Sequence, residues 1–115
     1  VTSTIGDDGR LLAQIAGTCD GIVLVAFGAG HLSPTQLQEL RAVEVPVLIT
    51  TRPERSAMLF ATYGFAAAER DLRATPAICV PFLSPAAARI ALLCCLGAGL
   101  DRDEMRTRLA PFDAS

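Results

Sequence analysis

The sequence contains no lysine and no tryptophan, and it has only one histidine and one tyrosine. All ten cationic residues are arginine, a bias that arginine-rich codon usage explains. Without lysine, the segment cannot supply a lysine general base, a Schiff-base lysine or the lysine of a phosphate-binding P-loop. The single histidine, His31, is not accompanied by a Gly-x-Ser-x-Gly elbow, so the sequence predicts no hydrolytic triad.

Metal-ligand spacing is also lacking. The four cysteines are Cys19, Cys79, Cys94 and Cys95, and none belongs to a Cys-x-x-Cys pair. With His31 as the one imidazole, we expect no metal site. We interpret the cysteines as small buried hydrophobic residues of a reducing compartment, which predicts a cytoplasmic location.

Long hydrophobic runs are missing as well. No apolar stretch reaches the ~18 residues that a membrane helix needs. The nearest one, residues 86–100, is interrupted by Arg89 and ends in Gly97-Ala98-Gly99. The amino end has no basic segment and no cleavage site of a signal peptide. The net charge of −2 and the pI near 5.2 argue against nucleic acid as a partner.

What the sequence has is an unusually large apolar share. A chain of 115 residues fits one domain that buries roughly 65% of its unfolded surface. The composition is 51% hydrophobic, with a mean hydropathy of +0.42. This surplus predicts a surface that another domain or subunit normally covers.

Apolar runs alternate with helically spaced apolar residues along the chain. The expected strands cover residues 1–5, 22–27, 45–51 and 77–80. The expected helices cover residues 11–16, a segment that begins at 34, a short segment at 69–74, residues 86–96 and a last segment that begins at 101. Strand 22–27 lacks polar alternation, as expected of a parallel sheet that is covered on both faces. The order predicts an α/β fold, namely a small three-layer α/β/α domain with about four parallel strands, of Rossmann/flavodoxin-like type.

The helix after residue 33 has the clearest start signal. Ser33 is a good N-cap, Pro34 suits the first helical position, and Gln36 completes a capping-box pattern. Leu32 and Leu37 have the spacing of a hydrophobic staple. The solvent-facing side of this helix is expected to carry Gln36, Gln38, Glu39 and Arg41.

Two other helices have distinct expectations. The helix over 86–96 is apolar nearly all round, which predicts burial on most sides, with Arg89 as a solvated or ion-paired exception. Asp101 and Glu104 form a second capping pattern, and the last helix is expected to bury Met105, Leu109 and Phe112. Capping also explains the carboxylate groups at 7–8 and 101–104 better than acid/base chemistry does.

A glycine turn follows the buried strand 22–27. Gly28, Ala29, Gly30 and His31 lie between that strand and the capped helix, and ligands of open α/β sheets bind at the carboxyl ends of strands. These four residues are therefore the candidate ligand-proximal turn. A dinucleotide fingerprint fails at its sixth position, which is Ser33. A tight turn without a ligand, with His31 as a structural residue, remains an alternative.

Several motifs, taken in order, resemble the carboxyl-terminal domain of bacterial L-asparaginases. The segment 20–34 (DGIVLVAFGAGHLSP) resembles the glycine-turn motif of that family, and 45–52 (VPVLITTR) resembles the strand that follows it. Tyr63-Gly64-Phe65 and Asp71-Leu72 continue the pattern. The segment 82–93 (FLSPAAARIALL) is similar to the family's leucine–serine/asparagine–proline helix. The resemblance covers nearly the whole chain.

The resemblance implies a two-domain parent enzyme that hydrolyses L-asparagine to aspartate and ammonia without a cofactor. Its nucleophilic threonines, a Lys–Asp pair and a tyrosine would lie in an amino-terminal catalytic domain, absent from residues 1–115, so no catalytic residue is expected here. The resemblance further implies a homodimer or homotetramer, in which Gly28 to His31 approach a small amino-acid amide in a neighbour's active site. The domain alone is then expected to be inactive.

The sequence departs from the family pattern at two positions. Ala29 stands where many relatives have an asparagine that can approach the substrate, and Ala87 stands where they often have lysine. Some relatives supply a glutamate from the loop after the strand at 45–51 to a neighbour's active site. Glu54 lies in the corresponding loop here, but it cannot be aligned with that glutamate. Two alternatives stay open. The chain could be a stand-alone module that binds a small anion at residues 28–33. It could also belong to the amide-hydrolysing subunit of a tRNA-dependent amidotransferase, although the acidic pI argues against this.

Overall fold

A parallel sheet forms the middle layer of the domain. The computed structural model describes residues 1–2, 8–26, 32–51 and 75–113. Its strands are β1 (Ile22–Ala26), β2 (Val47–Thr51) and β3 (Ile78–Cys79), in the spatial order β1-β2-β3. The register sets Ile22 opposite Val47 and Ala26 opposite Thr51, and β3 pairs with β2 in parallel as well.

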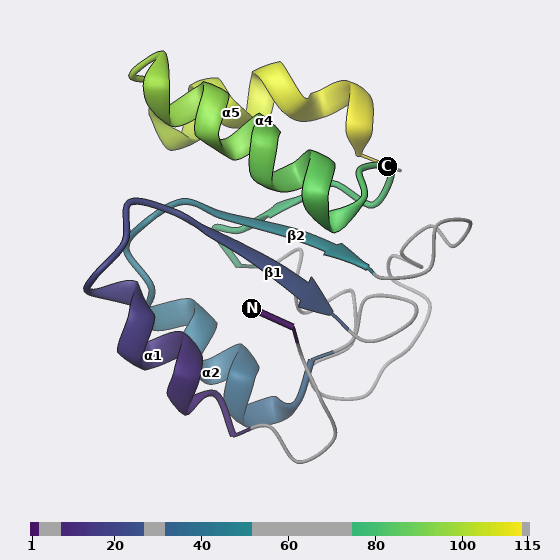
Figure 1. Ribbon diagram of the computed structural model, residues 1–115. Coiled ribbons are helices and arrows are strands. Elements are labelled where there is room, and N and C mark those ends of the chain that lie inside the picture. Colours follow the sequence, from purple (N-terminus) through teal and green to yellow (C-terminus); the bar gives the residue numbers. More distant parts are fainter. Residues whose placement is uncertain (3–7, 27–31, 52–74, 114–115) are drawn as a thin grey trace.

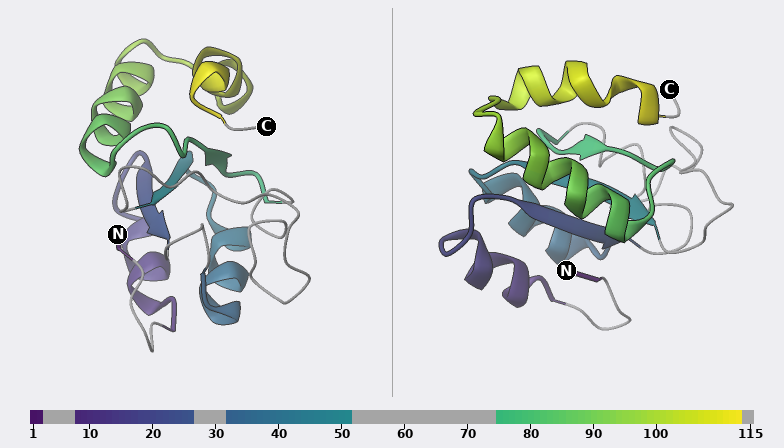
Figure 2. Two further views of the ribbon diagram at one scale, coloured as in Figure 1. Left: turned by 90° about the vertical axis from the view of Figure 1, so that its right-hand side faces the viewer. Right: turned by 45° about the horizontal axis from the view of Figure 1, so that its top comes forward.

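Helices cover both faces of this sheet (Figures 1 and 2). Helices α1 (Arg10–Ala16) and α2 (Pro34–Ala42) lie on one face, and α4 (Pro85–Gly97) and α5 (Arg102–Leu109) lie on the other, followed by the 3-10 turn η1 (Ala110–Phe112). Because side chains alternate along a strand, neighbouring residues of β2 serve opposite faces. Ile49 packs with the α1 and α2 residues, whereas Leu48 packs with those of α4 and α5. The predicted three-layer α/β/α class is confirmed.

Of the first expected strand, residues 1–5, the structure describes Val1 and Thr2, and both pair with β1. Thr2 forms an isolated parallel bridge with Val25, and Val1 exchanges backbone hydrogen bonds with the same edge of β1. Residues 3–7 lie outside the described part, as does the predicted helix 69–74. The described sheet therefore has three strands and one flanking bridge.

The helix starts follow the local capping signals. The Ser33 and Asp101 side chains each complete a capping box, and Ser84 caps α4 by accepting from the Ala87 N–H. Hydrogen bonds that Asp101 accepts from Glu104 and Asp103 hold the pKa of its carboxyl below the usual range. Negative charge at a helix N-terminus also complements the macrodipole.

Hydrogen bonds join helix α5 to the segments that precede β2 and β3. Arg102 Nη2 donates to the carbonyls of Glu44 at 2.7 Å and Val45 at 3.2 Å. Arg106 Nη2 donates to the Pro76 carbonyl at 3.2 Å. Met105 and Leu109 are buried, as predicted, but Phe112 belongs to η1 and is 37% exposed. Of the three residues that the last helix was expected to bury, Met105 and Leu109 are therefore buried and Phe112 is not.

The prediction that α4 is buried on most sides is wrong. Its inner face buries Ala88, Leu92 and Cys95 against the sheet, but Ile90 is 64% and Leu93 55% exposed. Helix α4 belongs to the outer layer, so only one stripe meets the core. Cys94 is exposed too, so the prediction of a buried Cys94 is also wrong. The apolar surplus of the sequence lies partly on this outer face.

Candidate functional site

The carboxyl-terminal edge of the sheet is the place where the sequence predicts a ligand. Strand β1 ends at Ala26, β2 ends beside it at Thr51, and the chain is described again from Leu32. Ala26 and Leu32 are both buried. The predicted turn residues Gly28, Ala29, Gly30 and His31 lie outside the described residues, as does Glu54. The described residues on either side of the turn are Ala26 at the end of β1 and Leu32 before α2.

The start of α2 uses its own side chains to satisfy its first backbone groups. The Gln36 N–H donates to Ser33 Oγ at 3.1 Å, and the Ser33 N–H donates to Gln36 Oε1 at 3.4 Å. Pro34 has no N–H to offer. Anion binding at a helix start depends on free N–H groups that point at the ligand. This arrangement leaves few such groups and so weighs against the small-anion alternative.

Gln36 itself is buried, contrary to the prediction that it faces solvent. Its side chain is 0% exposed, because position 36 lies one turn before Leu40 and shares the inner face of α2. The capping-box spacing predicts the hydrogen bonds between Gln36 and Ser33 but not the burial of the Gln36 side chain. The Nε2 atom of Gln36 is buried and has no hydrogen-bond partner within the part of the chain that the structure describes.

Two adjacent threonines end β2, and both are buried. The Thr50 hydroxyl donates to the Leu83 carbonyl, which joins the strand end to the segment before α4. Thr51 points to the opposite face of the sheet by strand alternation, toward the layer of α1 and α2. Its Oγ1 is buried, and none of the described residues forms a hydrogen bond with it. Sequence reasoning did not single out either hydroxyl.

The border of the predicted turn thus contains two buried polar atoms, Gln36 Nε2 and Thr51 Oγ1, that have no hydrogen-bond partner among residues 1–2, 8–26, 32–51 and 75–113. Burying a polar group without a hydrogen bond is unfavourable, and such groups in native structures need an explanation. Both come from elements that lead into or out of the carboxyl edge, α2 and β2. This edge is therefore chemically different from a plain apolar core.

The two threonines allow a matched test of this reading. Thr50→Val removes a donor and leaves the Leu83 carbonyl unpaired, so we expect a loss of about 1–2 kcal/mol in the free energy of unfolding. Thr51→Val replaces a hydroxyl that has no hydrogen-bond partner among the described residues by a methyl group of similar size, so the free energy of unfolding should stay constant or rise by about 1 kcal/mol. Urea denaturation of both variants measures it. A larger loss for Thr51→Val than for Thr50→Val would contradict the assignment.

The remaining chemistry-bearing residues of the described part do not form a second centre. No group of three or more potential ligands that could hold a metal ion occurs among the described His, Cys, Asp and Glu residues. Burial raises the pKa of the Cys95 thiol, and the neighbouring Cys94 adds to this shift, so the thiolate is disfavoured. Arg89 is exposed, as predicted. In the described segments, no helix has the length and apolarity needed to cross a membrane.

Comparisons with known proteins agree with the ordered motifs. The model of the Glutaminase/Asparaginase C-terminal domain family matches residues 1–109. A probable L-asparaginase of Deinococcus radiodurans is 36% identical over 101 residues, which are 88% of this chain and 31% of that relative. The structure of the thermostable L-asparaginase from Thermococcus kodakarensis is similar with a TM-score of 0.71 and 27% identity, covering 93% of this chain and 33% of the other. The chain thus spans about a third of the length of these relatives.

The family model covers most of the chain, and the sequence motifs, the three-layer fold and the similar structure all agree with it. The chain belongs to the Glutaminase/Asparaginase C-terminal domain family.

Proposed function

We propose that this chain is the carboxyl-terminal domain of an amidohydrolase that converts L-asparagine to L-aspartate and ammonia. The match of the family model over residues 1–109 carries the proposal, and the 36% identity to a probable L-asparaginase supports the substrate. In this proposal the domain supplies one border of the active site, and an amino-terminal domain supplies the reacting groups.

The chemistry of the described residues fits a supporting role. Nucleophilic catalysis requires a hydroxyl or thiol next to a base that takes its proton. The Thr50 hydroxyl already donates to a backbone carbonyl, and no described residue accepts a hydrogen bond from Thr51 Oγ1 as a base would. The whole sequence has no lysine, so it cannot supply the Lys–Asp pair that the asparaginase resemblance implies. The proposed threonine nucleophile therefore belongs to the other domain.

The carboxyl edge of the sheet is the proposed border of the active site. Gly28, Ala29, Gly30 and His31 join β1 to α2 at this edge and would face the amide substrate. The buried polar atoms of Gln36 and Thr51, which have no hydrogen-bond partner among the described residues, support a role for this edge beyond packing. Ala29 offers no side-chain hydrogen bond, so substrate selection would rest on backbone groups and on the catalytic domain.

Assembly into a homodimer or homotetramer is part of the proposal. The exposed apolar residues of α4, Ile90 and Leu93, together with Phe82 at 62% exposure, are unusual for a surface that only meets water. Contact with a second domain or subunit would remove this area from solvent. The assembly would also bring the turn of one subunit to the active site of its neighbour.

The isolated chain is expected to release no ammonia from L-asparagine above the uncatalysed rate, because its proposed nucleophile is elsewhere. The measurement is a coupled ammonia assay on the purified chain, with the full-length Deinococcus radiodurans relative as the positive control. Ammonia release by the isolated chain at a rate near that of the full-length enzyme would overturn the division of roles. The proposed activity would be overturned if the full-length protein that contains this domain hydrolyses neither asparagine nor glutamine.

A further inference from the structure

Helix α4 is apolar on its outer face as well as on the face that meets the sheet. Arg89 is the one charged residue among its 13 residues. A surface helix normally carries polar residues opposite its buried stripe, and a helix that is apolar all round is covered on both sides. The exposed residues opposite the buried stripe, here called the outer stripe, are Ala86, Ile90, Leu93 and Gly97. None of the described elements buries this outer stripe.

The outer stripe is symmetric about its own centre. Its members follow one another at steps of four, three and four residues, which keeps them on one face of an α-helix. The large side chains of Ile90 and Leu93 lie in the middle, and the small residues Ala86 and Gly97 lie at the ends. An antiparallel copy of α4 around a two-fold axis would set Ile90 against the partner's Leu93 and Ala86 against the partner's Gly97. The outer stripe is therefore complementary to itself, as a two-fold interface requires.

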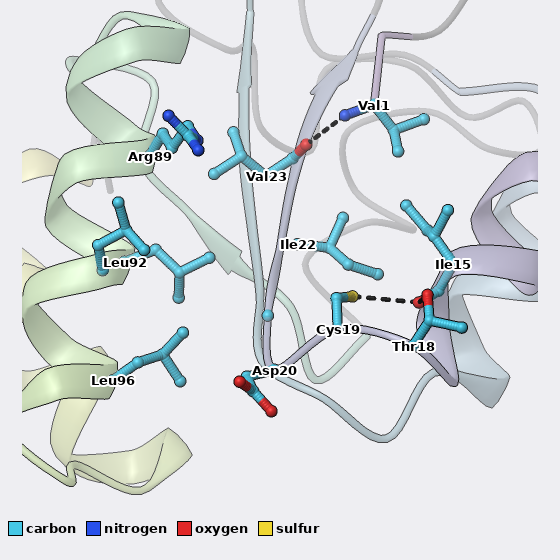
Figure 3. Close-up of a pocket in the computed structure, with 12 residues that line it drawn as sticks. Val1, Ile15, Thr18, Cys19, Asp20, Ile22, Val23, Arg89, Leu92 and Leu96 are labelled. Atoms are coloured by element: carbon cyan, nitrogen blue, oxygen red, sulfur yellow. Dashed lines mark hydrogen bonds between the residues drawn. The ribbon is translucent and has the colours of Figure 1, made fainter.

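The charges beside the outer stripe fit the same antiparallel arrangement. Arg89 and Asp20 are both exposed, and both lie on the side of α4 that borders β1. Figure 3 shows Arg89 toward the start of α4 and Asp20 near Leu96, toward the end of the helix. Neither charge forms an ion pair within the described part of the chain. A two-fold axis brings the start of one α4 to the end of the other on the same side, so Arg89 of each copy would approach Asp20 of its partner.

We propose that the outer stripe of α4 binds the outer stripe of a second copy of this chain, antiparallel and around a two-fold axis, with Arg89 of each copy paired with Asp20 of the other. This inference deepens the assembly part of the proposed function, and it does not depend on the proposed reaction. The contact is separate from the one proposed at the carboxyl edge of the sheet.

The size of this contact sets the expected affinity. A contact between two single helices is smaller than the roughly 800 Å² per partner of a standard interface. We therefore expect the chain by itself to dimerise weakly, with dissociation at micromolar concentrations, and to be monomeric in dilute solution. In a longer protein that also assembles through other surfaces, this helix pair would add to their affinity.

Sedimentation equilibrium of the chain over about a hundredfold range of concentration tests the proposal. Reducing agent keeps disulfides of the exposed Cys94 from contributing. We expect a reversible monomer–dimer equilibrium that Leu93→Glu weakens by about tenfold or more, because the added carboxylates would be buried in an apolar contact. The matched control is Leu11→Glu on α1, since Leu11 is 53% and Leu93 55% exposed. This control should leave the dimerisation constant unchanged.

Reversal of the two charges tests the antiparallel direction. Arg89→Asp and Asp20→Arg each replace two attractive contacts of the dimer by two repulsive ones, so each variant should weaken dimerisation by about fivefold or more at low salt. The variant that carries both substitutions restores opposite charges at both ends. Its dimerisation constant should return to within about twofold of the original value.

Three results would overturn the proposal: a chain that is monomeric at every concentration, a dimer that Leu93→Glu leaves unchanged, or charge reversals that the double variant does not restore. Thermal unfolding shows whether each variant is folded. If Leu93→Glu does not unfold cooperatively, Ile90→Glu takes its place in the same comparison. These readouts do not involve asparagine. A failure here therefore leaves the proposed activity intact, and an inactive parent leaves this inference intact.

Discussion

Replacing Leu48 by alanine is expected to lower the free energy of unfolding by about 3–5 kcal/mol. Leu48 is 0% exposed and lies in β2, the central strand of the sheet. Its side chain belongs to the core cluster that joins the sheet to α4 and α5 through Ala88, Leu92 and Met105. Truncation would leave a cavity between two layers that the surrounding backbone cannot close, because strand pairing and helix packing hold both sides.

The matched control is Leu93→Ala on the outer face of α4. Leu93 is 55% exposed, so its loss should change the unfolding free energy by about 0.5 kcal/mol or less. Urea denaturation of the two variants at one pH provides the comparison, with the m-value as a check that both unfold in the same way. Equal losses at the two positions would mean that α4 does not have the inner and outer faces described above.

Replacing Gly9 by alanine is expected to lower the unfolding free energy by about 3 kcal/mol. Gly9 caps the start of α1 with a φ of 82°, a left-handed conformation that is costly for residues with a Cβ. The added Cβ would lie 2.8 Å from Glu39 Cγ and 3.2 Å from Gln36 Cα. The side chain of Glu39 can move, but the Gln36 backbone cannot move without shifting α2. Strain and crowding therefore act together.

Gly17→Ala is the control for this second prediction. Gly17 ends α1 with a φ of −85°, which alanine adopts without strain, and a Cβ there would meet nothing within 4 Å. Alanine reduces the conformational freedom of the unfolded chain, so stability should rise by about 0.5 kcal/mol. Thermal unfolding should therefore move in opposite directions for the two variants. Similar downward shifts would contradict the left-handed cap at Gly9.

The parts of the fold that sequence reasoning predicted well have local causes. The helices begin at Pro34, Pro85 and Arg102 because the preceding Ser33, Ser84 and Asp101 cap them with their own side chains. Such capping depends on residues only a few positions apart. The buried strands β1 and β2 were also expected, since an apolar run without polar alternation is typical of a covered parallel strand.

The parts that it missed depend on neighbours that are distant in sequence. Gln36 was expected in solvent because of its polarity, yet the inner face of α2 includes it. Ile90 and Cys94 were expected to be buried because of their hydrophobicity, yet they lie on the outer face of α4. The turn Gly28 to His31 lies outside the described residues, so its role near a substrate stays a prediction.

Sequence alone determined the class of the domain, the starts of three helices and, through ordered motifs, the asparaginase resemblance, because each of these is encoded in short segments read in order. Tertiary structure decided which face of each helix meets the sheet, and that Gln36 Nε2 and Thr51 Oγ1 are buried with no hydrogen-bond partner in the described part of the chain. Burial and hydrogen-bond satisfaction are properties of pairs of elements, and no single segment specifies its partner.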